Sequence, residues 1–321
     1  MKLPEFKVEV LCITYQHASF IKDALDGFCM QQTSFPYIIA VVDDASTDGE
    51  QEVINQYLRE YFDLEKEETY FKDADEGVYT YAQHKTNKNC YILSLNLKRN
   101  LYHQKGAKSK LIAPWTKMAK YIAECEGDDY WIDPLKLQRQ TDFLDAYPEY
   151  VAVAENGMVQ NLVTNTSYPF NTATSHDVTM EEVIITRRFP TAGVIYQKAA
   201  LDGIVNTCRI IKDTIQWCWL ISKGRFRYEQ HISSVYRKGE QGMTVYTEPY
   251  AFAREIETWN KEILRVFNVR KSFMYLHNAK IYKSFIVPAL RQRHFLSALK
   301  CLFQGVIYTI KAFMNKIFKP E

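Results

Sequence analysis

Short apolar runs alternate with helix-like stretches through the first 145 residues of this chain. Residues 8–14, 37–42, 89–95 and 120–125 are β-rich or continuously apolar, and residues 19–30 carry apolar side chains at helical spacing. A second helix-like stretch follows the 37–42 run and continues to about residue 61. Strands that alternate with helices predict an α/β fold with an open, mostly parallel sheet flanked by helices. In such sheets, ligands bind at the carboxyl ends of the strands.

Three of the predicted strands end in polar residues. Thr14 and Tyr15 close the first run, Asp43 and Asp44 close the second, and residues 126–129 follow the fourth. One carboxylate after the second run can accept a hydrogen bond from a base N–H or a ribose hydroxyl. The alternative is that this loop only caps the helix that follows it.

The segment EGDD at residues 126–129 places carboxylates directly after a predicted buried strand. Carboxylates repel one another unless a cation lies among them. Carboxylate oxygens suit Mg²⁺ or Mn²⁺, and such ions typically bridge protein carboxylates to substrate phosphates. Gly127 permits a tight turn and the close approach of a ligand. The alternative interpretation is a loop of solvated acids at a helix entry.

The remainder of the chain predicts further α/β structure and then a helical end. We expect one domain over residues 1–248, with a nucleotide-binding half (1–133) and an acceptor half (134–248), and a basic helical extension over 249–321. The later predicted elements are a helix to about 147, strands at 151–159, 193–196 and 227–236, a helix at 214–222, and a loop at 161–175.

Composition excludes some classes of protein and leaves others open. The net charge is only +2, which gives no argument for a nucleic-acid partner. The seven cysteines include no C-x-x-C pair and no zinc spacing, which favours a reduced, cytoplasmic chain. The N-terminus has no long apolar segment, so we expect no signal peptide. No run of roughly 18 uninterrupted apolar residues occurs, so we expect no membrane-spanning helix.

Three segments together resemble glycosyltransferase family 2, an inverting family with the GT-A fold. They read CITYQHASFIKDALDG, VVDDASTDGEQEVI and YIAECEGDDYWIDPLKLQRQTDFL. The order, spacing and strand context match the nucleotide-binding motifs of that family, and the EGDDYW form is similar to bacterial members that build surface polysaccharides. Ala45 replaces the usual glycine of the second motif, and Glu126 replaces the first acid of the third.

The resemblance implies roles for the residues at the strand ends. Thr14 and Tyr15 would lie along the base, and Asp43 or Asp44 would contact base and ribose. Asp128 would be the main metal ligand, for Mg²⁺ or Mn²⁺ on the diphosphate. The other residues that the resemblance places at the donor are Asn100, Glu126 and Gly127 near the nucleotide, and Asp129, Tyr130 and Trp131 on the acceptor or sugar side.

A catalytic base is expected further along the chain. An inverting transfer needs a carboxylate to take the proton of the acceptor hydroxyl. The segment KDTIQWCWL resembles the family context of that acid, which implies the base role for Asp213. The alternative is that Asp213 only caps a helix. Glu181 and Glu182 are weaker candidates.

The segment VYRKGEQGMT, residues 235–244, resembles a further family motif in which a histidine helps to hold metal or diphosphate. Gly239 occupies the histidine position here. Arg237 and Lys238 are candidates to replace it as partners of the departing diphosphate. The alternative for both is a solvated turn.

The end of the chain is strongly basic. Residues 251–321 hold 13 Lys and Arg against 4 Asp and Glu, and no acid occurs between Lys271 and Pro320. Apolar residues recur at helical spacing within 297–319, with lysines among them. A basic amphipathic helix of this kind is expected to lie on an anionic membrane surface. The alternative is a helix packed on the body of the protein.

These observations predict an enzyme that moves a sugar from a nucleotide-diphosphate sugar, expected to be a UDP-sugar, to a glycan or lipid-linked acceptor in bacterial surface polysaccharide synthesis. It would be cytoplasmic and peripheral on the inner face of the membrane. A nucleotidyltransferase is a rival that also uses strand-end acids, but the segment TYQHASF is no Gly-rich phosphate loop. The changes at Ala45, Glu126 and Gly239 leave open a catalytically weak sugar-nucleotide-binding protein.

Overall fold

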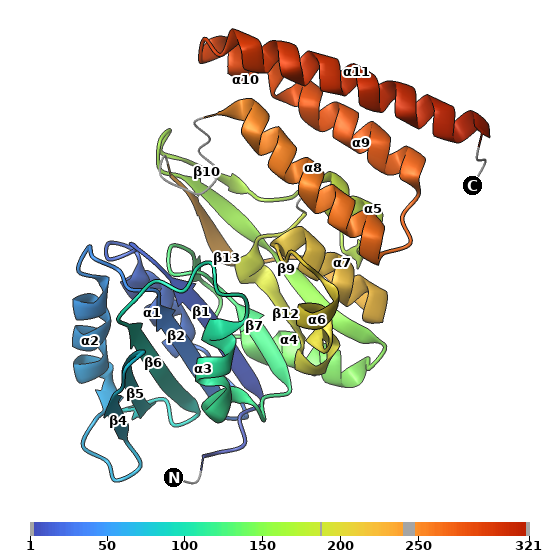
Figure 1. Ribbon diagram of the computed structural model, residues 1–321. Coiled ribbons are helices and arrows are strands. Elements are labelled where there is room, and N and C mark those ends of the chain that lie inside the picture. Colours follow the sequence, from blue (N-terminus) through green and yellow to red (C-terminus); the bar gives the residue numbers. More distant parts are fainter. Residues whose placement is uncertain (1–2, 187, 240–247, 319–321) are drawn as a thin grey trace. The chain divides into compact units, whose positions relative to one another are not determined.

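The computed structural model describes residues 3–186, 188–239 and 248–318, and these residues divide into two compact units (Figure 1). The first unit comprises Met1–Thr179, Arg188–Asp202 and Lys223–Lys238. The second comprises Met180–Arg187, Gly203–Ser222 and Gly239–Glu321. Both units are discontinuous in sequence. The functional division expected at residue 248 stays a prediction.

A mixed sheet of 13 strands runs through the first unit. Its centre consists of β7, β1, β2 and β6 in that order, and each neighbouring pair of these strands is parallel. Antiparallel strands extend it on both sides, with β5 beside β6 and β12 between β7 and β9. The central and flanking strands are β1 (Val8–Thr14), β2 (Tyr37–Asp43), β5 (Gly77–His84), β6 (Cys90–Leu97), β7 (Tyr121–Glu124), β9 (Tyr150–Asn161), β12 (Val194–Gln197) and β13 (Arg225–Lys238). The short strands are β3 (Phe62–Asp63), β4 (Tyr70–Asp73), β8 (Tyr130–Trp131), β10 (Thr166–Pro169) and β11 (His176–Asp177).

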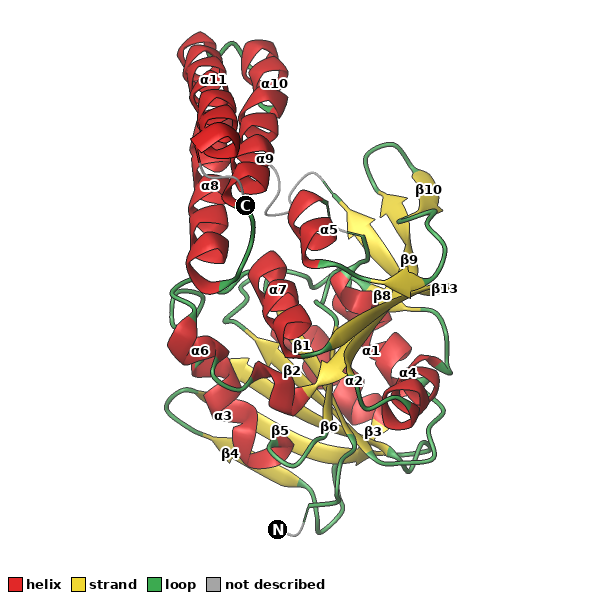
Figure 2. Ribbon diagram, turned by 90° about the vertical axis from the view of Figure 1, so that its right-hand side faces the viewer, coloured by secondary structure: helices red, strands yellow, loops and turns green. Residues whose placement is uncertain are grey.

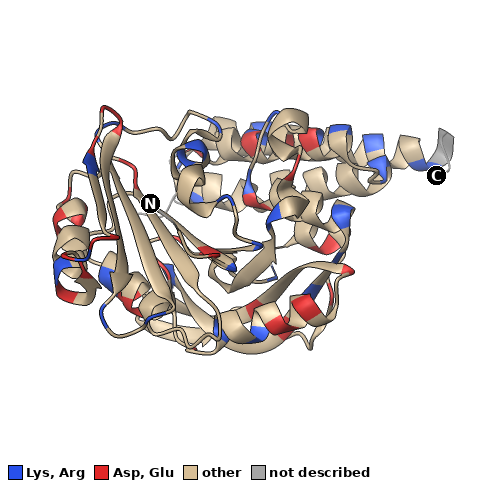
Figure 3. Ribbon diagram, turned by 90° about the horizontal axis from the view of Figure 1, so that it is seen from below, with Lys and Arg blue, Asp and Glu red and all other residues tan. Residues whose placement is uncertain are grey.

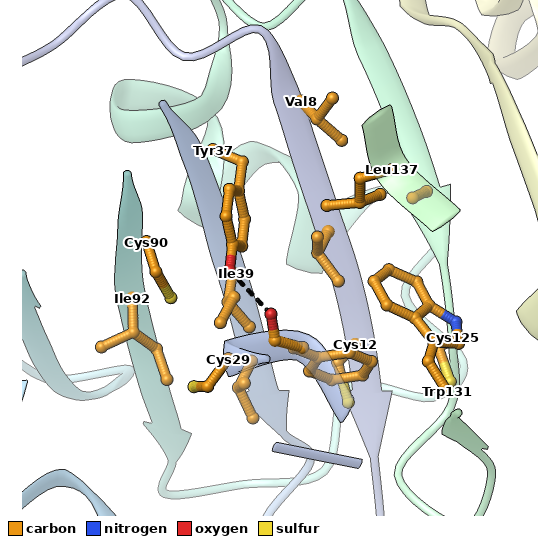
Figure 4. Packing of buried hydrophobic residues seen from close by; sticks show 14 of the residues in the cluster. Val8, Cys12, Cys29, Tyr37, Ile39, Cys90, Ile92, Cys125, Trp131 and Leu137 are labelled. Carbon is orange, nitrogen blue, oxygen red and sulfur yellow. Dashed lines mark hydrogen bonds between the residues drawn. The ribbon is translucent and has the colours of Figure 1, made fainter. Parts of the chain in front are cut away.

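Helices cover both faces of the parallel centre. On one face, side chains of α1 (Ile21–Cys29), α2 (Glu50–Tyr61) and α4 (Lys136–Ala146) pack against alternate sheet residues such as Ile39 (Figure 4). In that cluster the Tyr37 hydroxyl donates a hydrogen bond to the Phe28 carbonyl (2.8 Å). On the opposite face, α3 (Ala107–Thr116) packs against the other set, which includes Ile38. A strand buried on both faces has to be apolar throughout, which explains the continuous run in β2.

The second unit is helical. Its helices are α5 (Met180–Ile185), α6 (Ile204–Thr207), α7 (Asp213–Lys223), α8 (Pro249–Val266), α9 (Lys271–Ser284), α10 (Ile286–Arg291) and α11 (Phe295–Phe318). Figure 2 shows α8, α9, α10 and α11 as a bundle of long and short helices. A small apolar cluster joins them, formed by Ala253, Ala279, Tyr282, Cys301 and Tyr308. The predicted helical end of the chain is therefore confirmed.

The predicted elements are present, but the structure also holds elements that were not predicted, among them α3, and it differs from the predictions in the following segments. Residues 161–175 were expected to be loop, but they contain β10, which pairs with β9. The strands between residues 62 and 84 were not predicted, although burial largely alternates along β5. In addition, Phe295–Lys316 of α11 is long and apolar enough to cross a membrane by length and composition. The expectation of no membrane-spanning helix stays a prediction, because length and composition alone do not show that a helix crosses a membrane.

Candidate functional site

The polar strand ends meet at one edge of the sheet in the first unit. Thr14 of β1 is in register with Asp43 of β2, and Asp43 with Asn96 of β6. On the other side of β1, the backbone N–H of Cys125, just beyond β7, donates to the Leu11 carbonyl (3.1 Å). The loops that follow β1, β2 and β7 therefore converge where parallel α/β sheets bind their ligands.

The two carboxylate oxygens of Asp43 differ in their hydrogen bonds. The side chain is fully buried. Its Oδ1 accepts hydrogen bonds from the Ser46 backbone N–H (3.0 Å) and the Gln51 side-chain amide (2.5 Å). Its Oδ2 is buried and has no hydrogen-bond partner among the residues that the structure describes. A buried carboxylate oxygen without a partner is costly unless a ligand donates to it.

Asp44 has different surroundings. Its Oδ1 accepts the Leu101 backbone N–H (2.6 Å), and its Oδ2 pairs with the Lys108 ammonium (2.6 Å). Asn100 supports the same loop, because its side-chain amide donates to the Asp44 carbonyl (3.0 Å) and its Oδ1 accepts the Tyr102 N–H (2.9 Å). Asp44 and Asn100 thus have protein partners. Of the two acids predicted to contact base and ribose, Asp43 is the one with a carboxylate oxygen available to a ligand.

The loops after β1 and β2 are tied together in strained backbone conformations. Gln16 and Ala45 have φ values of 61° and 63°, in the left-handed region that glycine favours. The Gln16 N–H donates to Ser46 Oγ (2.9 Å), and its side-chain amide donates to Thr47 Oγ1 (2.9 Å). Ala45 therefore keeps the conformation that the usual glycine of this motif adopts freely, at a cost in backbone strain.

The Glu50 carboxylate accepts hydrogen bonds from the loops after β1 and β2. A role for this residue was not predicted from the sequence. Its carboxylate is buried, with Oε1 accepting from the Thr14 hydroxyl and Oε2 from the His17 N–H (2.9 Å) and Ser46 Oγ (2.8 Å). Burial raises the pKa of the Glu50 carboxyl, although these hydrogen bonds oppose the rise. The sequence feature that could have indicated Glu50 is its position directly after Gly49, at the start of the helix that follows the acidic loop.

Gly127 is required by packing within the protein. A Cβ added there would lie 2.0 Å from Thr14 Oγ1 and 3.1 Å from Ile21 Cδ1. The loop after β7 thus rests on the end of β1. The close approach expected of Gly127 occurs against protein atoms, and its contact with a nucleotide stays a prediction.

Asp128 carries the second carboxylate oxygen without a partner. Its Oδ1 is buried and has no hydrogen-bond partner within residues 3–186, 188–239 and 248–318, while its Oδ2 lies 3.9 Å from His17 Nε2. No group of three or more His, Cys, Asp or Glu that could hold a metal ion occurs among the residues that the structure describes. One carboxylate completed by phosphate oxygens fits Mg²⁺ or Mn²⁺. The donor set at Asp128 is compatible with that arrangement, and His17 was not predicted to face it.

Arg237 holds the EGDD loop in place. Its backbone N–H donates to Asp129 Oδ1 (2.8 Å), and its guanidinium donates to the Asp128 carbonyl (3.1 Å) and pairs with Asp23. The guanidinium carbon lies 4.2 Å from the centre of the Tyr130 ring. Arg237 therefore positions the loop through contacts that the sequence did not indicate, and its predicted contact with a diphosphate stays a prediction.

Trp131 lies in the core of the first unit. The side chain is 2% exposed, and its Nε1 donates to the Ala192 carbonyl (2.8 Å). The Lys136 ammonium lies 4.4 Å from the ring centre and donates to Gln140 Oε1 (2.7 Å). Burial lowers the pKa of Lys136 to about 8. These contacts give Trp131 a packing role, and they do not support its prediction as a wall of the sugar pocket.

The other predicted residues at the sheet edge are open to solvent. Tyr15 is 46% exposed, which leaves a ring face available for stacking on a base. Glu126 and Lys238 are also exposed.

Asp213 belongs to the second unit. It is the exposed first residue of α7, and Glu181 and Glu182 lie in the first turn of α5. The base role of Asp213 stays a prediction. Gly239 is the last described residue of its segment, so the rest of the motif at 240–244 lies outside the described residues.

Comparisons with known proteins show the fold. Staphylococcus aureus TarS residues 1–349, solved in complex with UDP, superimposes with a TM-score of 0.54 over 96% of this chain and 89% of that chain, at 16% identity. The mannosyltransferase PcManGT from Pyrobaculum calidifontis, solved with GDP-Man and Mn²⁺, gives a TM-score of 0.52 over 100% of this chain and 89% of that chain, at 13% identity. This chain has the GT-A glycosyltransferase fold. The resemblance found in the motifs is confirmed at the level of fold.

The sequence relatives add no function. Three mycobacterial proteins, from Mycobacterium bovis and two strains of Mycobacterium tuberculosis, are 33% identical over 142 residues, and each is described as an uncharacterized protein. The match covers 44% of this chain and 32% of each relative, so the chain matches about a third of their length. No protein-family model matches the chain.

Proposed function

We propose that this protein is an inverting, metal-dependent glycosyltransferase that uses a nucleotide-diphosphate sugar. The observation that carries the proposal is the pair of buried carboxylate oxygens without partners, on Asp43 and Asp128, at the convergence of three strand ends. The GT-A fold supports it, since the two structural neighbours were solved with UDP and with GDP-Man and Mn²⁺. We propose a UDP-sugar as the donor.

Each residue has a proposed part in donor binding. Asp43 Oδ2 accepts a hydrogen bond from the base or ribose, and the exposed ring of Tyr15 stacks on the base. Asp128 would hold Mg²⁺ or Mn²⁺, which when bound neutralises charge on the leaving diphosphate. Glu50 holds the loops after β1 and β2, and Arg237 holds the loop after β7, before the donor arrives. Donor binding therefore has little entropy cost for ordering these loops.

The transfer step needs a base on the acceptor side. We propose that the Asp213 carboxylate takes the proton of the acceptor hydroxyl as the oxygen attacks the anomeric carbon. The bond to the nucleotide diphosphate breaks on the opposite side, so the configuration inverts. We propose a glycan or lipid-linked acceptor in the synthesis of a bacterial surface polysaccharide, which is the setting of the proteins that the EGDDYW segment resembles.

A screen of UDP- and GDP-sugars for hydrolysis tests the donor proposal. We expect turnover of at least one of them with Mn²⁺ or Mg²⁺ and its loss on chelation. Asp213→Asn should abolish transfer while leaving donor binding intact, because it removes only the base. Metal-dependent binding without turnover of any donor would point to the sugar-nucleotide-binding alternative, and turnover unaffected by chelation would contradict the proposal.

A further inference from the structure

Helix α11 uses one side to pack within the second unit. Ala298, Cys301, Tyr308 and Ala312 are buried at spacings of three, seven and four residues, which places them on one side of the helix. Gly305 continues this side, because a Cβ there would lie 3.4 Å from the side chain of Lys283 in α9. This small-residue side brings α11 close to α9.

The opposite side of α11 is apolar and exposed. Leu299, Phe303, Val306, Ile310 and Phe313 follow one another at alternating spacings of four and three residues. Leu299 is 62% exposed, Phe303 65% and Phe313 64%. A helix of a soluble domain normally presents polar residues on the side away from its core. A contiguous exposed apolar stripe indicates an interaction surface.

The lysines of α11 border this stripe. With about 100° of rotation per residue, Lys300 and Lys311 fall on one flank of the stripe and Lys316 on the other. No acidic residue occurs from Lys271 to Pro320, so no acid on α9, α10 or α11 opposes these charges. Figure 3 shows the part of α11 nearest the C-terminus with Lys and Arg bands alone.

The geometry points to an anionic lipid bilayer as the partner, and we propose that α11 lies in the plane of its interface. The apolar stripe would enter the headgroup and acyl boundary, and the flanking lysines would reach lipid phosphates along their alkyl stems. The absence of acids in this segment gives the charge complementarity with anionic lipid. We place the protein accordingly on the cytoplasmic face of the cell membrane.

A helix in the plane of the interface explains why one side of α11 packs on α9 and the other is apolar and exposed. A spanning helix does not explain the packed side. The candidate span is 28% buried in the protein, through the side that packs on α9. If α11 crossed the bilayer it would have to leave α9 and expose Tyr282 and Tyr308, which stack with ring centroids 6.0 Å apart. Lipid binding by α11 would hold whether or not the protein transfers sugar.

Vesicle sedimentation of the full-length protein tests this surface. We expect binding to phosphatidylcholine vesicles that contain phosphatidylglycerol, little binding to phosphatidylcholine alone, and release at about 1 M salt, where the Debye length falls to ~3 Å. Replacing Lys300, Lys311 and Lys316 with Gln should weaken binding by at least about tenfold. The matched control replaces three exposed lysines of the first unit: Lys72, Lys110 and Lys117.

A second variant tests the contribution of the apolar stripe to lipid binding. Serine at Leu299, Phe303 and Phe313 should abolish binding, whereas serine at the exposed Phe71, Met118 and Leu162 of the first unit should not. Circular dichroism and UDP binding of each variant report folding separately from lipid binding. Equal binding by the α11 and control variants would overturn the proposal. Resistance of the membrane-bound protein to alkaline carbonate would overturn it in favour of a spanning helix, and self-association through the stripe without lipid binding would overturn it in favour of a second copy.

Discussion

Adjacent carboxylates with different partners are the main feature of the site at the scale of single residues. Asp44 is neutralised by Lys108, whereas Asp43 keeps one buried oxygen without a partner. The sequence places both acids at the strand end but does not distinguish them. The difference comes from Lys108 and the Leu101 N–H, which reach Asp44 only through the tertiary fold.

Replacing Ala45 with glycine is expected to stabilise the protein. Ala45 holds a φ of 63°, which glycine adopts without the steric cost that a Cβ brings. After the entropy cost of glycine in the unfolded chain, we expect a gain of roughly 0.5 to 1 kcal/mol in the free energy of unfolding. Denaturant unfolding measures it. Ala113→Gly in α3 is the control, with an expected loss of about 1 kcal/mol; a loss at both positions would contradict the backbone assignment at Ala45.

Replacing Glu50 with Gln is expected to weaken nucleotide binding. The substitution keeps the shape of the side chain but removes one of the two oxygens that accept from Thr14, His17 and Ser46. A buried donor that loses its acceptor costs about 1 to 3 kcal/mol, which lowers the population of the observed loop conformation. If UDP binds that conformation, its affinity should fall about tenfold or more. Calorimetric titration with UDP measures this. The exposed Glu52→Gln in the same helix is the control, and equal affinity for all three proteins would refute the positioning role of Glu50.

At the scale of elements, the stability of the second unit's helices is expected to depend on pH. His277 in α9 is buried, and burial lowers its pKa from the ordinary histidine value of 6.5 to about 4. Above pH 6.5 the ring is neutral in both folded and unfolded chains. Between pH 6.5 and about 4 only the unfolded chain takes up the proton, so stability falls as the pH decreases.

The expected loss is about 3 kcal/mol between pH 7 and about pH 4, from a pKa difference of roughly 2.5 units at 1.36 kcal/mol each. Urea unfolding as a function of pH, followed by tryptophan fluorescence, measures it. His277→Gln should flatten the dependence in this window, whereas His294→Gln, at an exposed position, should not. An unchanged pH profile in His277→Gln would show that this ring is not the source.

The elements that could be predicted from sequence are those whose burial pattern is local. The parallel centre was predictable because β1, β2, β6 and β7 are apolar runs followed by polar loops. The antiparallel side was not, because β12 is only four residues long and joins β7 to β9 through pairings far apart in the chain. β10 was missed because all of its residues are exposed and its sequence is typical of a loop.

At the scale of the whole molecule, chemistry and charge are divided between two units. The strand-end acids lie in the first unit, and the acid-free segment from Lys271 to Pro320 belongs to the second. The sequence showed the charge asymmetry, but not that Met180–Arg187 and Gly203–Ser222 belong to the same unit as the C-terminal helices. The partners of each acid, and thus which carboxylates remain open to a ligand, required the structure.

The measurement that tests the central claim most directly is calorimetric binding of UDP with and without Mn²⁺, for the unmodified protein, Asp128→Asn and Asp75→Asn. Asp75 is an exposed acid of the same unit and serves as the control. We predict that Mn²⁺ strengthens UDP binding by about tenfold or more in the unmodified protein and in Asp75→Asn, because Asp128 would hold the ion and the ion would offset the charge of the diphosphate. In Asp128→Asn this gain should disappear while binding without metal changes little. A gain from Mn²⁺ that survives in Asp128→Asn would contradict the assignment of the metal and the donor diphosphate to Asp128.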